Sequence, residues 1–226
     1  MMNGILIVNK PQGMTSHDVV DLMRRHFGLK KVGHAGTLDP MATGVLVMLV
    51  GATTKCSQDL SGQEKEYDAT LTLGARSDTG DAWGKLESSS KDIRFNDAEI
   101  EAVFRKFVGD IEQVPPMYSA VKINGKKLYE LARKGITVEA PPRKISIKDI
   151  TISAIALPEV HFRLTCSKGT YVRQLCVDIG EALGCGAYLS RLERTRSGRF
   201  HIDAALSVDE LKKIRVADLH TKLLPS

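Results

Sequence analysis

The stretch Gly33-His-Ala-Gly-Thr-Leu-Asp-Pro-Met-Ala-Thr-Gly44 leads directly into an apolar run over residues 45–50. Its three glycines let the backbone adopt positive φ and approach another body closely. Pro40 fixes its own φ and favours an extended conformation at Asp39, so the carboxylate is held in a defined direction. A loop built this stiffly around one acid, just before a strand, predicts a functional site.

Asp39 also has a purely structural interpretation. Aspartate before proline commonly initiates a turn, and aspartate is a favoured helix N-cap. On local chemistry alone the structural role is favoured, because turn residues greatly outnumber catalytic ones. The choice between the two roles depends on the rest of the chain.

Composition bounds the class of protein. A chain of 226 residues, 42% of them hydrophobic, suits one large domain or a domain with a small appendage. No apolar run approaches the roughly 18 residues that a membrane span needs, and the N-terminus does not resemble a signal peptide. The four cysteines have no C-x-x-C spacing, which disfavours a zinc ribbon and indicates reduced thiols. We therefore expect a cytoplasmic protein without membrane association.

Charge is distributed unevenly along the chain. The net charge is +5, but residues 1–116 carry 13 Lys/Arg against 16 Asp/Glu, a net −3. Residues 117–226 carry 19 Lys/Arg against 11 Asp/Glu, a net +8. A basic half suits a polyanionic partner such as nucleic acid, although a solvated basic face would look the same.

Hydrophobic patterning predicts an α+β fold around a mainly antiparallel sheet, because strands and helices mix without strict βαβ alternation. The expected strands are 5–8, 45–50, 67–73, 145–155 and 160–166, the last two forming a hairpin. The expected helices begin at the N-cap Ser16 and end at Gly28, span 97–108, open at 169–170 and end at Gly184, and span 207–214. The polar segment 73–91 predicts a loop.

Residues 113–144 differ from the rest of the chain. Pro-Pro and Asn-Gly pairs bracket a short expected helix at 126–133, and seven lysines and arginines lie in the segment. With so little apolar content, the segment is expected to form a mobile basic flap on the surface.

Five strings carry the strongest signal. They are Asn9-Lys-Pro-Gln-Gly-Met-Thr-Ser16, the Asp39 loop, Lys65-Glu-Tyr67, the stretch of residues 115–135, and Ser167-Lys-Gly-Thr-Tyr-Val-Arg173. Read locally, Tyr67 is more often a core residue, because aromatic rings fill sheets well. Arg173 is equally well a solvated side chain or an anion-binding group at a strand-to-helix turn. In this order and spacing, the strings resemble the TruB-type tRNA pseudouridine synthases from about residue 5 to residue 207.

The resemblance implies the pseudouridine synthase fold and assigns three catalytic residues. Asp39 matches the nucleophilic aspartate, which attacks either C6 of the uracil base or C1′ of the ribose. Tyr67 matches the tyrosine that stacks on the flipped base and assists proton removal at C5. Arg173 matches the arginine that pairs with the catalytic carboxylate and favours its ionised form.

Further residues are assigned to the substrate by the same resemblance. His34 matches the histidine that fills the space left by the flipped nucleotide, although a lone loop histidine would be the preferred local interpretation. Tyr171 and Leu192 match residues that line the base pocket. Lys10, Lys55 and the basic flap are the expected phosphate contacts, and Asp81 is expected to join the polar network of the site.

The resemblance implies uridine 55 in the T loop of tRNA as the substrate, extruded before reaction, with no metal and no cofactor. The protein is expected to act as a monomer, with residues 1–226 as one catalytic domain. Family members commonly continue into a small PUA domain, which is not expected within these 226 residues; either the sequence is truncated or this member is naturally short, and the difference is expected to affect affinity for tRNA rather than chemistry.

Two rival functions are weighed against this one. A tRNA-binding or folding chaperone would keep the basic surface without needing Asp39, whose charge would cost affinity for phosphates. A nucleotide-binding enzyme is disfavoured because the glycine loop matches neither G-x-x-x-x-G-K-[ST] nor G-x-G-x-x-G.

Overall fold

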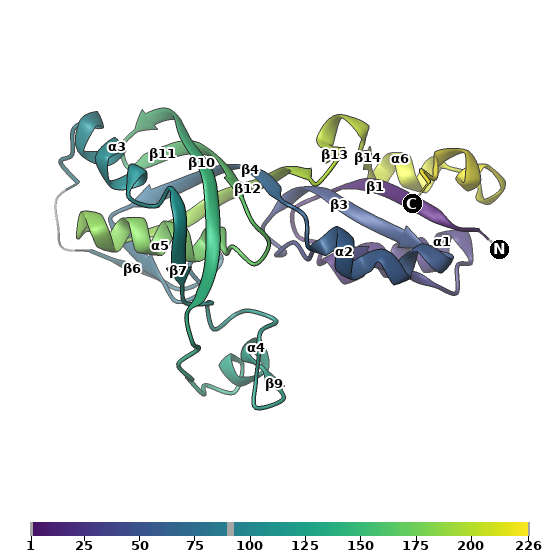
Figure 1. The fold of residues 1–226 in the computed structure, drawn as a ribbon, viewed down its shortest axis with the longest axis horizontal. Helices are drawn as coiled ribbons and strands as arrows, with labels where there is room; N and C mark the ends of the chain where they lie inside the picture. Colours follow the sequence, from purple (N-terminus) through teal and green to yellow (C-terminus); the bar gives the residue numbers. More distant parts are fainter. Residues whose placement is uncertain (1, 90–92, 226) are drawn as a thin grey trace. The chain divides into compact units, whose positions relative to one another are not determined.

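The computed structural model describes residues 2–89 and 93–225 and has the α+β architecture expected from the sequence (Figure 1). The sheet is mixed and mostly antiparallel. The chain divides into two compact units, one formed by Met1–Asp68 with Leu192–Ser226 and the other by Ala69–Arg191. The division falls within β4 (Lys65–Leu73) and β12 (Ala187–Ser197), so each of these strands contributes residues to both units.

The first unit is built on the strand order β14-β1-β3-β12. β1 (Gly4–Lys10) pairs antiparallel with the whole of β3 (Thr43–Val50) and parallel with β14 (Leu206–Ser207). The other edge of β3 is shared: β2 (Val32–Ala35) pairs antiparallel with its C-terminal half, and β12 pairs parallel with its first two residues. The loop between β2 and β3 therefore starts after Ala35, which pairs with Val47 of β3, and ends at Thr43, where β12 pairs with β3.

Both faces of β1 and β3 are buried, which explains their nearly continuous apolar sequences. One face joins Ile7, Val47 and Phe200 in a common core. Helix α1 (Ser16–Phe27) begins with a capping box between Thr15 and Asp18. The N-cap is thus one residue earlier than predicted, whereas the expected end is confirmed by left-handed Gly28.

Short elements complete the first unit. They are the 3₁₀ helices η1 (Gly51–Cys56), η2 (Ile202–Ala204) and η3 (Val216–Lys222), helices α2 (Ser57–Ser61) and α6 (Val208–Lys213), and strand β13 (Phe200–His201).

The second unit has the strand order β12-β4-β11-β10-β7. The predicted hairpin is present as β10 (Arg143–Ala156) and β11 (Glu159–Cys166), and β7 (Gly109–Gln113) adds to its edge. Alternate residues of β11 are buried, as expected for a strand with one covered face. Helices α3 (Asp97–Arg105) and α5 (Val172–Leu183) pack in this unit, where Phe104 of α3 meets Phe162 edge-to-face at 5.4 Å.

Residues 113–144 extend from β7 and β10 as an excursion of their own (Figure 1). The excursion contains β8 (Lys122–Ile123), β9 (Lys126–Lys127) and α4 (Leu128–Ala132). The predicted helix is therefore shorter, because its first two residues form a strand. A small apolar cluster of Val121, Leu128 and Ala140 lies inside the excursion and holds it together.

Several elements were missed by patterning. The segment expected as a loop at 73–91 contains the hairpin of β5 (Ala75–Ser77) and β6 (Leu86–Ser88), while residues 90 and 91 lie outside the described part. β2, β7 and β12 were also missed. Two of these strands are short, and β12 mixes polar with apolar residues.

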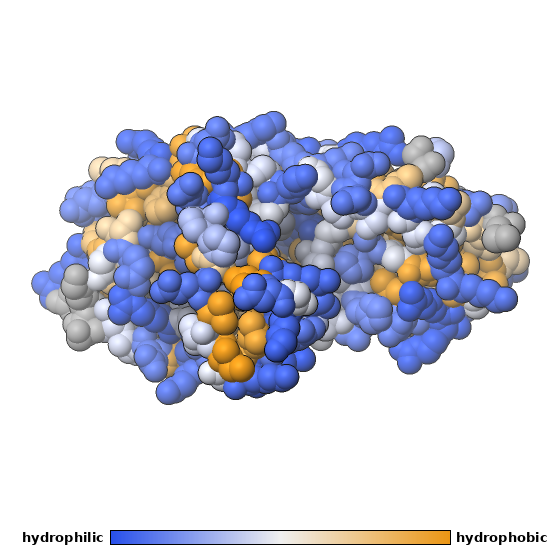
Figure 2. Space-filling view, turned by 60° about the horizontal axis from the view of Figure 1, so that its bottom comes forward, coloured by the Kyte–Doolittle hydropathy of each residue, from blue (hydrophilic) through white to orange (hydrophobic). Residues whose placement is uncertain are grey.

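Hydrophilic side chains predominate on the face drawn in Figure 2, and apolar ones gather in smaller patches. In the part of the chain that the structure describes, no helix has the length and apolarity to cross a membrane.

Candidate active site

Asp39 lies half-buried between β2 and β3, in a loop that is tied on both sides to the loop before α1. On one side, Leu38 N–H donates to Ser16 Oγ at 2.9 Å, and Ser16 Oγ lies 3.1 Å from the carbonyl oxygen of Leu38. On the other side, Gly13 N–H donates to Pro40 O at 2.9 Å. The first two family-like strings are therefore parts of one structure that fixes the backbone on either side of the carboxylate.

Arg194 of β12 also holds this loop, through its side chain. This residue was missed by the sequence analysis. Its guanidinium is 1% exposed. Nε donates to Val45 O at 2.8 Å, Nη2 to Gly36 O at 2.9 Å and Nη1 to Thr37 O at 3.3 Å. Three carbonyl oxygens that precede and follow Asp39 thus share one buried cation.

Two of the three predicted roles for glycine are confirmed. Gly36 has φ +86° and Gly44 has φ +100°, whereas Gly33 lies in β2 without positive φ. A Cβ at Gly44 would lie 2.3 Å from the carbonyl oxygen of Arg194. Gly44 is therefore required by the close approach of β12, a strand of this chain.

Lys10 is completely buried at the end of β1. Its Nζ donates to Met14 O at 2.7 Å and Pro11 O at 2.9 Å. The pKa of Lys10 is lowered to about 8, chiefly by burial; Asp39 opposes this shift and Arg194 adds to it. The predicted contact with phosphate does not fit this position, and Lys10 instead braces the loop before α1 and acts on Asp39 electrostatically.

His34 lies in β2, a strand rather than the expected loop. Its pKa is lowered by burial and, to a smaller extent, by the positive charge of Arg194. Nδ1 is buried and has no hydrogen-bond partner among the described residues. The lowered pKa favours the uncharged form of the ring.

The other predicted residues of the first unit differ in exposure. Tyr67 in β4 is 9% exposed and Leu192 in β12 is 6% exposed, so both side chains are buried. Lys55 lies on the exposed side of η1. Of the two lysines predicted to contact phosphate, only Lys55 is accessible.

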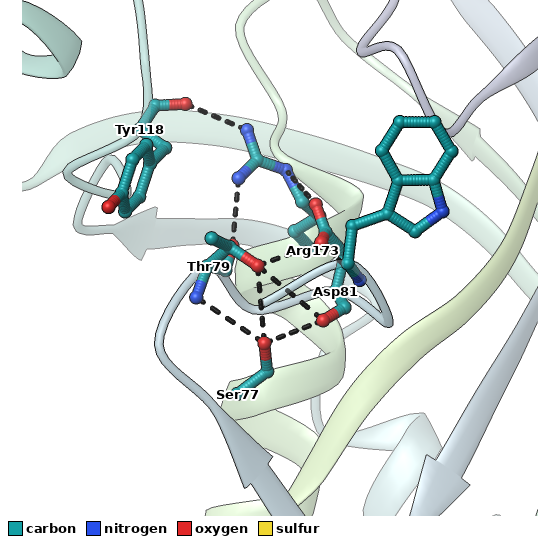
Figure 3. Close-up of polar contacts among 6 residues, drawn as sticks. Ser77, Thr79, Asp81, Tyr118 and Arg173 are labelled. Atoms are coloured by element: carbon teal, nitrogen blue, oxygen red, sulfur yellow. Dashed lines mark hydrogen bonds and ion pairs between the residues drawn. The ribbon is translucent and has the colours of Figure 1, made fainter. Parts of the chain in front are cut away.

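The second unit holds Arg173 in a network with Asp81, shown in Figure 3. Arg173, at the start of α5, is 4% exposed. Nη1 donates to Thr79 O and Nη2 to Tyr118 O, both at 2.8 Å, and Nε lies 3.7 Å from Asp81 Oδ2. Asp81 is 7% exposed, and its Oδ1 accepts from Thr79 Oγ1 at 2.7 Å. The predicted polar role of Asp81 thus has a structural basis, and the interpretation of Arg173 as a solvated surface residue is wrong.

Tyr171 is placed by Gln113, a buried side chain at the end of β7 that patterning also missed. Tyr171 N–H donates to Gln113 Oε1 at 2.8 Å, and Gln113 Nε2 donates back to Tyr171 O at 3.1 Å. The Tyr171 side chain packs against the apolar cluster of residues 113–144. Tyr171 therefore links the start of α5 to that excursion.

The structure groups the predicted residues within each unit. The first unit contains Asp39, Tyr67, His34, Lys10, Lys55 and Leu192, and the second contains Arg173, Asp81 and Tyr171. The ion pair expected between Arg173 and Asp39 joins residues of different units and stays a prediction. Across residues 2–89 and 93–225, no three His, Cys, Asp or Glu side chains are arranged as metal ligands.

The fold is similar to chains in two solved complexes. A chain in the crystal structure of a Cbf5-Nop10-Gar1 complex is 33% identical, with a TM-score of 0.74 over 92% of this chain. A chain in the structure of an H/ACA RNP bound to a substrate RNA containing 2′-deoxyuridine is 30% identical, with a TM-score of 0.69 over 92% of this chain. The present chain spans 53% and 52% of these two chains, about half of their length.

Sequence comparison reaches nearly the whole chain. The tRNA pseudouridine synthase B of Opitutus terrae is 45% identical over 99% of this chain and 93% of its own length. The tRNA pseudouridine synthase B of Syntrophotalea carbinolica is 48% identical over 99% of this chain and 73% of its own length. The model of the N-terminal domain of TruB family pseudouridylate synthases matches residues 24–172, and the model of the tRNA pseudouridylate synthase B C-terminal domain matches residues 173–225. The chain therefore belongs to the TruB family of pseudouridylate synthases, which are isomerases.

Proposed function

We propose that this chain converts uridine 55 in the T loop of tRNA to pseudouridine, with Asp39 as the nucleophile. Membership of the family supports the reaction, and the names of the relatives from Opitutus terrae and Syntrophotalea carbinolica support tRNA as the substrate. The assignment of Asp39 as the nucleophile rests on the surroundings of this residue. Asp39 is half-buried, and the backbone on both sides of it is fixed by Ser16, Gly13 and Arg194.

The chemistry balances without a cofactor, because the product is an isomer of the substrate. If Asp39 attacks C1′, the C1′–N1 bond breaks and uracil leaves with the electron pair on N1. Uracil then rotates, C5 displaces the carboxylate from C1′, the C5 proton is lost and N1 gains a proton. If Asp39 adds to C6 instead, the C1′–N1 bond breaks and the C1′–C5 bond forms within the adduct. Loss of the C5 proton and elimination of the carboxylate from C6 then restore the ring, and N1 gains a proton. In both cases one hard step is divided into easier ones.

The neighbouring side chains have distinct roles in this proposal. Lys10 interacts electrostatically with Asp39, and Arg194 holds the backbone of the Asp39 loop. Tyr67 stacks on the extruded base and assists removal of the C5 proton, Leu192 lines the base pocket, and Arg173 pairs with the carboxylate. Tyr171 also lines the pocket, and Asp81 orients Arg173 through their ion pair. His34, neutral because of its lowered pKa, takes the place of the flipped nucleotide.

The T arm of tRNA is the proposed partner, bound by a monomer in the cytoplasm. Exposed cations on residues 113–144 and Lys55 contact the phosphates, so this excursion clamps the T arm. The exposed cations of the excursion are Lys122, Lys126, Arg133, Lys134, Arg143 and Lys144.

The decisive variant is Asp39→Asn, which preserves the shape of the side chain and removes the nucleophile. Pseudouridine formation in transcribed tRNA should fall by at least about 10⁴-fold, while the Kd for tRNA changes little. Asp59→Asn is the matched control, because Asp59 is an exposed aspartate on α2 of the same unit. Residual turnover by Asp39→Asn above background would refute the nucleophile. Wild-type protein that binds and refolds tRNA but forms no pseudouridine would instead favour the chaperone function.

A further inference from the structure

Trp83 is the single tryptophan of the chain, and it lies in the turn between β5 and β6. Its side chain is 54% exposed, although tryptophan is among the residues with most to gain from burial. The residue is two positions after Asp81, whose carboxylate pairs with Arg173. An exposed indole thus lies beside the buried network of a predicted catalytic arginine.

The turn that presents Trp83 is held by hydrogen bonds on both sides of the residue. Trp83 N–H donates to Asp81 Oδ1 at 3.0 Å, and Ala82 N–H donates to Leu189 O at 2.9 Å. Lys85 N–H donates to Asp78 Oδ1 at 2.8 Å. The same carboxylate that pairs with Arg173 therefore also fixes the backbone of Trp83.

Gly84 makes the turn tighter still. A Cβ at Gly84 would lie 2.2 to 2.4 Å from side-chain oxygens of Asp78, Thr79 and Ser77, so no larger residue fits without displacement. The backbone that carries the indole is accordingly ordered before any ligand arrives. A surface that is already ordered loses little conformational entropy on binding.

In the described part of the chain, the two faces of the indole have no ring or cation contact. Lys85 lies two residues away with its side chain 79% exposed, and its ion pair with Glu87 at 3.5 Å is a weak surface pair. An aromatic face beside an accessible cation suits a nucleotide, because the base can stack while the cation meets the phosphate.

We propose that Trp83 forms a stacking subsite for an unpaired nucleotide of the substrate tRNA, beside the network that holds Arg173. This inference rests on the proposed function for the identity of the RNA. It adds a binding residue that none of the five family-like strings contains. Because the turn is tied to Asp81, the subsite also connects RNA binding to the network that holds Arg173.

The single tryptophan provides a direct readout of stacking. The full-length Asp39→Asn variant, which binds without turnover, is titrated with transcribed tRNA while the indole fluorescence is recorded. Stacking predicts saturable quenching whose midpoint equals the Kd from filter binding. Unchanged fluorescence at saturating tRNA would overturn the subsite, as would equal quenching by a fully paired RNA duplex of similar length.

Substitutions test the energetic role in the same Asp39→Asn background. Trp83→Ala should raise the Kd for tRNA by roughly 5- to 100-fold, the range for loss of one base–aromatic stack. Trp83→Phe keeps a ring and should raise it by less than about threefold. Leu86→Ala, which trims another exposed apolar side chain of the same hairpin, should leave it within about twofold. Equal Kd values for Trp83→Ala and its parent would refute the proposal.

The outcomes separate this inference from the function on which it rests. If the unaltered chain forms no pseudouridine but tRNA quenches Trp83 and Trp83→Ala weakens binding, the subsite stands and the proposed reaction fails. If pseudouridine forms while Trp83→Ala binds and reacts like the unaltered chain, the reaction stands and the subsite fails.

Discussion

Arg194 and Arg173 are two buried arginines with different surroundings. Arg194, in the first unit, donates only to backbone carbonyls, at Gly36, Thr37 and Val45. No carboxylate forms an ion pair with it among the residues that the structure describes. Arg173, in the second unit, donates to two carbonyls and also faces the carboxylate of Asp81.

The difference indicates two uses of the same side chain. Five N–H groups in a fixed plane let a guanidinium gather several carbonyl oxygens at once, which no other side chain does as well. Arg194 donates these hydrogen bonds to the backbone around Asp39, so the residue positions the loop. At Arg173 the carboxylate of Asp81 orients the guanidinium without ending its capacity to act on a further anion. Arg194 thus mainly supports the backbone of the loop, whereas Arg173 is oriented by Asp81 as a cation.

The largest expected effect is on the rate, at Arg173. Arg173→Met should lower the single-turnover rate of pseudouridine formation by about 10³-fold at saturating enzyme, because the proposed pairing of Arg173 with the Asp39 carboxylate would be lost. Arg173→Lys keeps the charge and should recover part of that rate. Thermal melts followed by circular dichroism identify the temperature at which both variants are folded, and the rates are compared there. Equal rates for wild type and Arg173→Met would end the distinction between the two arginines.

The second effect is on stability, at Arg194. Arg194→Met removes the guanidinium donors of three carbonyl oxygens, one of them buried and two partly buried, so the free energy of unfolding should fall by about 3 kcal/mol. Urea denaturation measures it, with Arg191→Met as the control, since Arg191 is an exposed arginine on the same strand. The control should change the value by less than about 1 kcal/mol. A full loss of activity in Arg194→Met with unaltered stability would instead give Arg194 a direct part in the chemistry.

The smallest effect concerns Lys10, a buried cation that, unlike arginine, can lose its proton. Its pKa is lowered from 10.5 to about 8 in the folded protein, so between these values the unfolded chain binds more protons than the native one. The free energy of unfolding of the wild type, relative to Lys10→Met, should therefore rise by on the order of 2 kcal/mol from pH 7 to pH 10. Urea denaturation of both proteins at the two pH values measures the difference, in which the other titrating groups cancel. Parallel pH dependence would show that burial does not penalise the charge of Lys10.

Much of the fold was predictable from patterning where one physical signal dominated. β1, β3 and β11 are apolar or strictly alternating, and α1 has a clear cap at Gly28, so their types were predicted correctly. β12 was missed because its buried phase includes Arg194, a charged residue at a position where alternation calls for an apolar one. The charged residue at an apolar position was itself a signal of a functional or structural role, because a buried charge in a strand requires specific partners.

The candidate site was predictable in its residue types and less so in their roles. Asp39, Tyr67 and Arg173 were identified from strings that resemble those of a family, whereas Arg194 and Gln113 lie outside these strings and act through backbone atoms. Lys10 was assigned to phosphate together with Lys55 and the basic flap, on the resemblance to the family. Its burial follows from two carbonyl acceptors that only the folded loop provides.

The sequence by itself determined the fold class, the family and the carboxylate at Asp39, because motifs and periodicity are local properties of a chain. Tertiary structure alone decided how that carboxylate is supported. Gly13 and Ser16 come from one segment and Arg194 from another, and both segments meet the loop that holds Asp39. Their contribution arises from contacts between residues far apart in sequence, and no local pattern encodes those contacts.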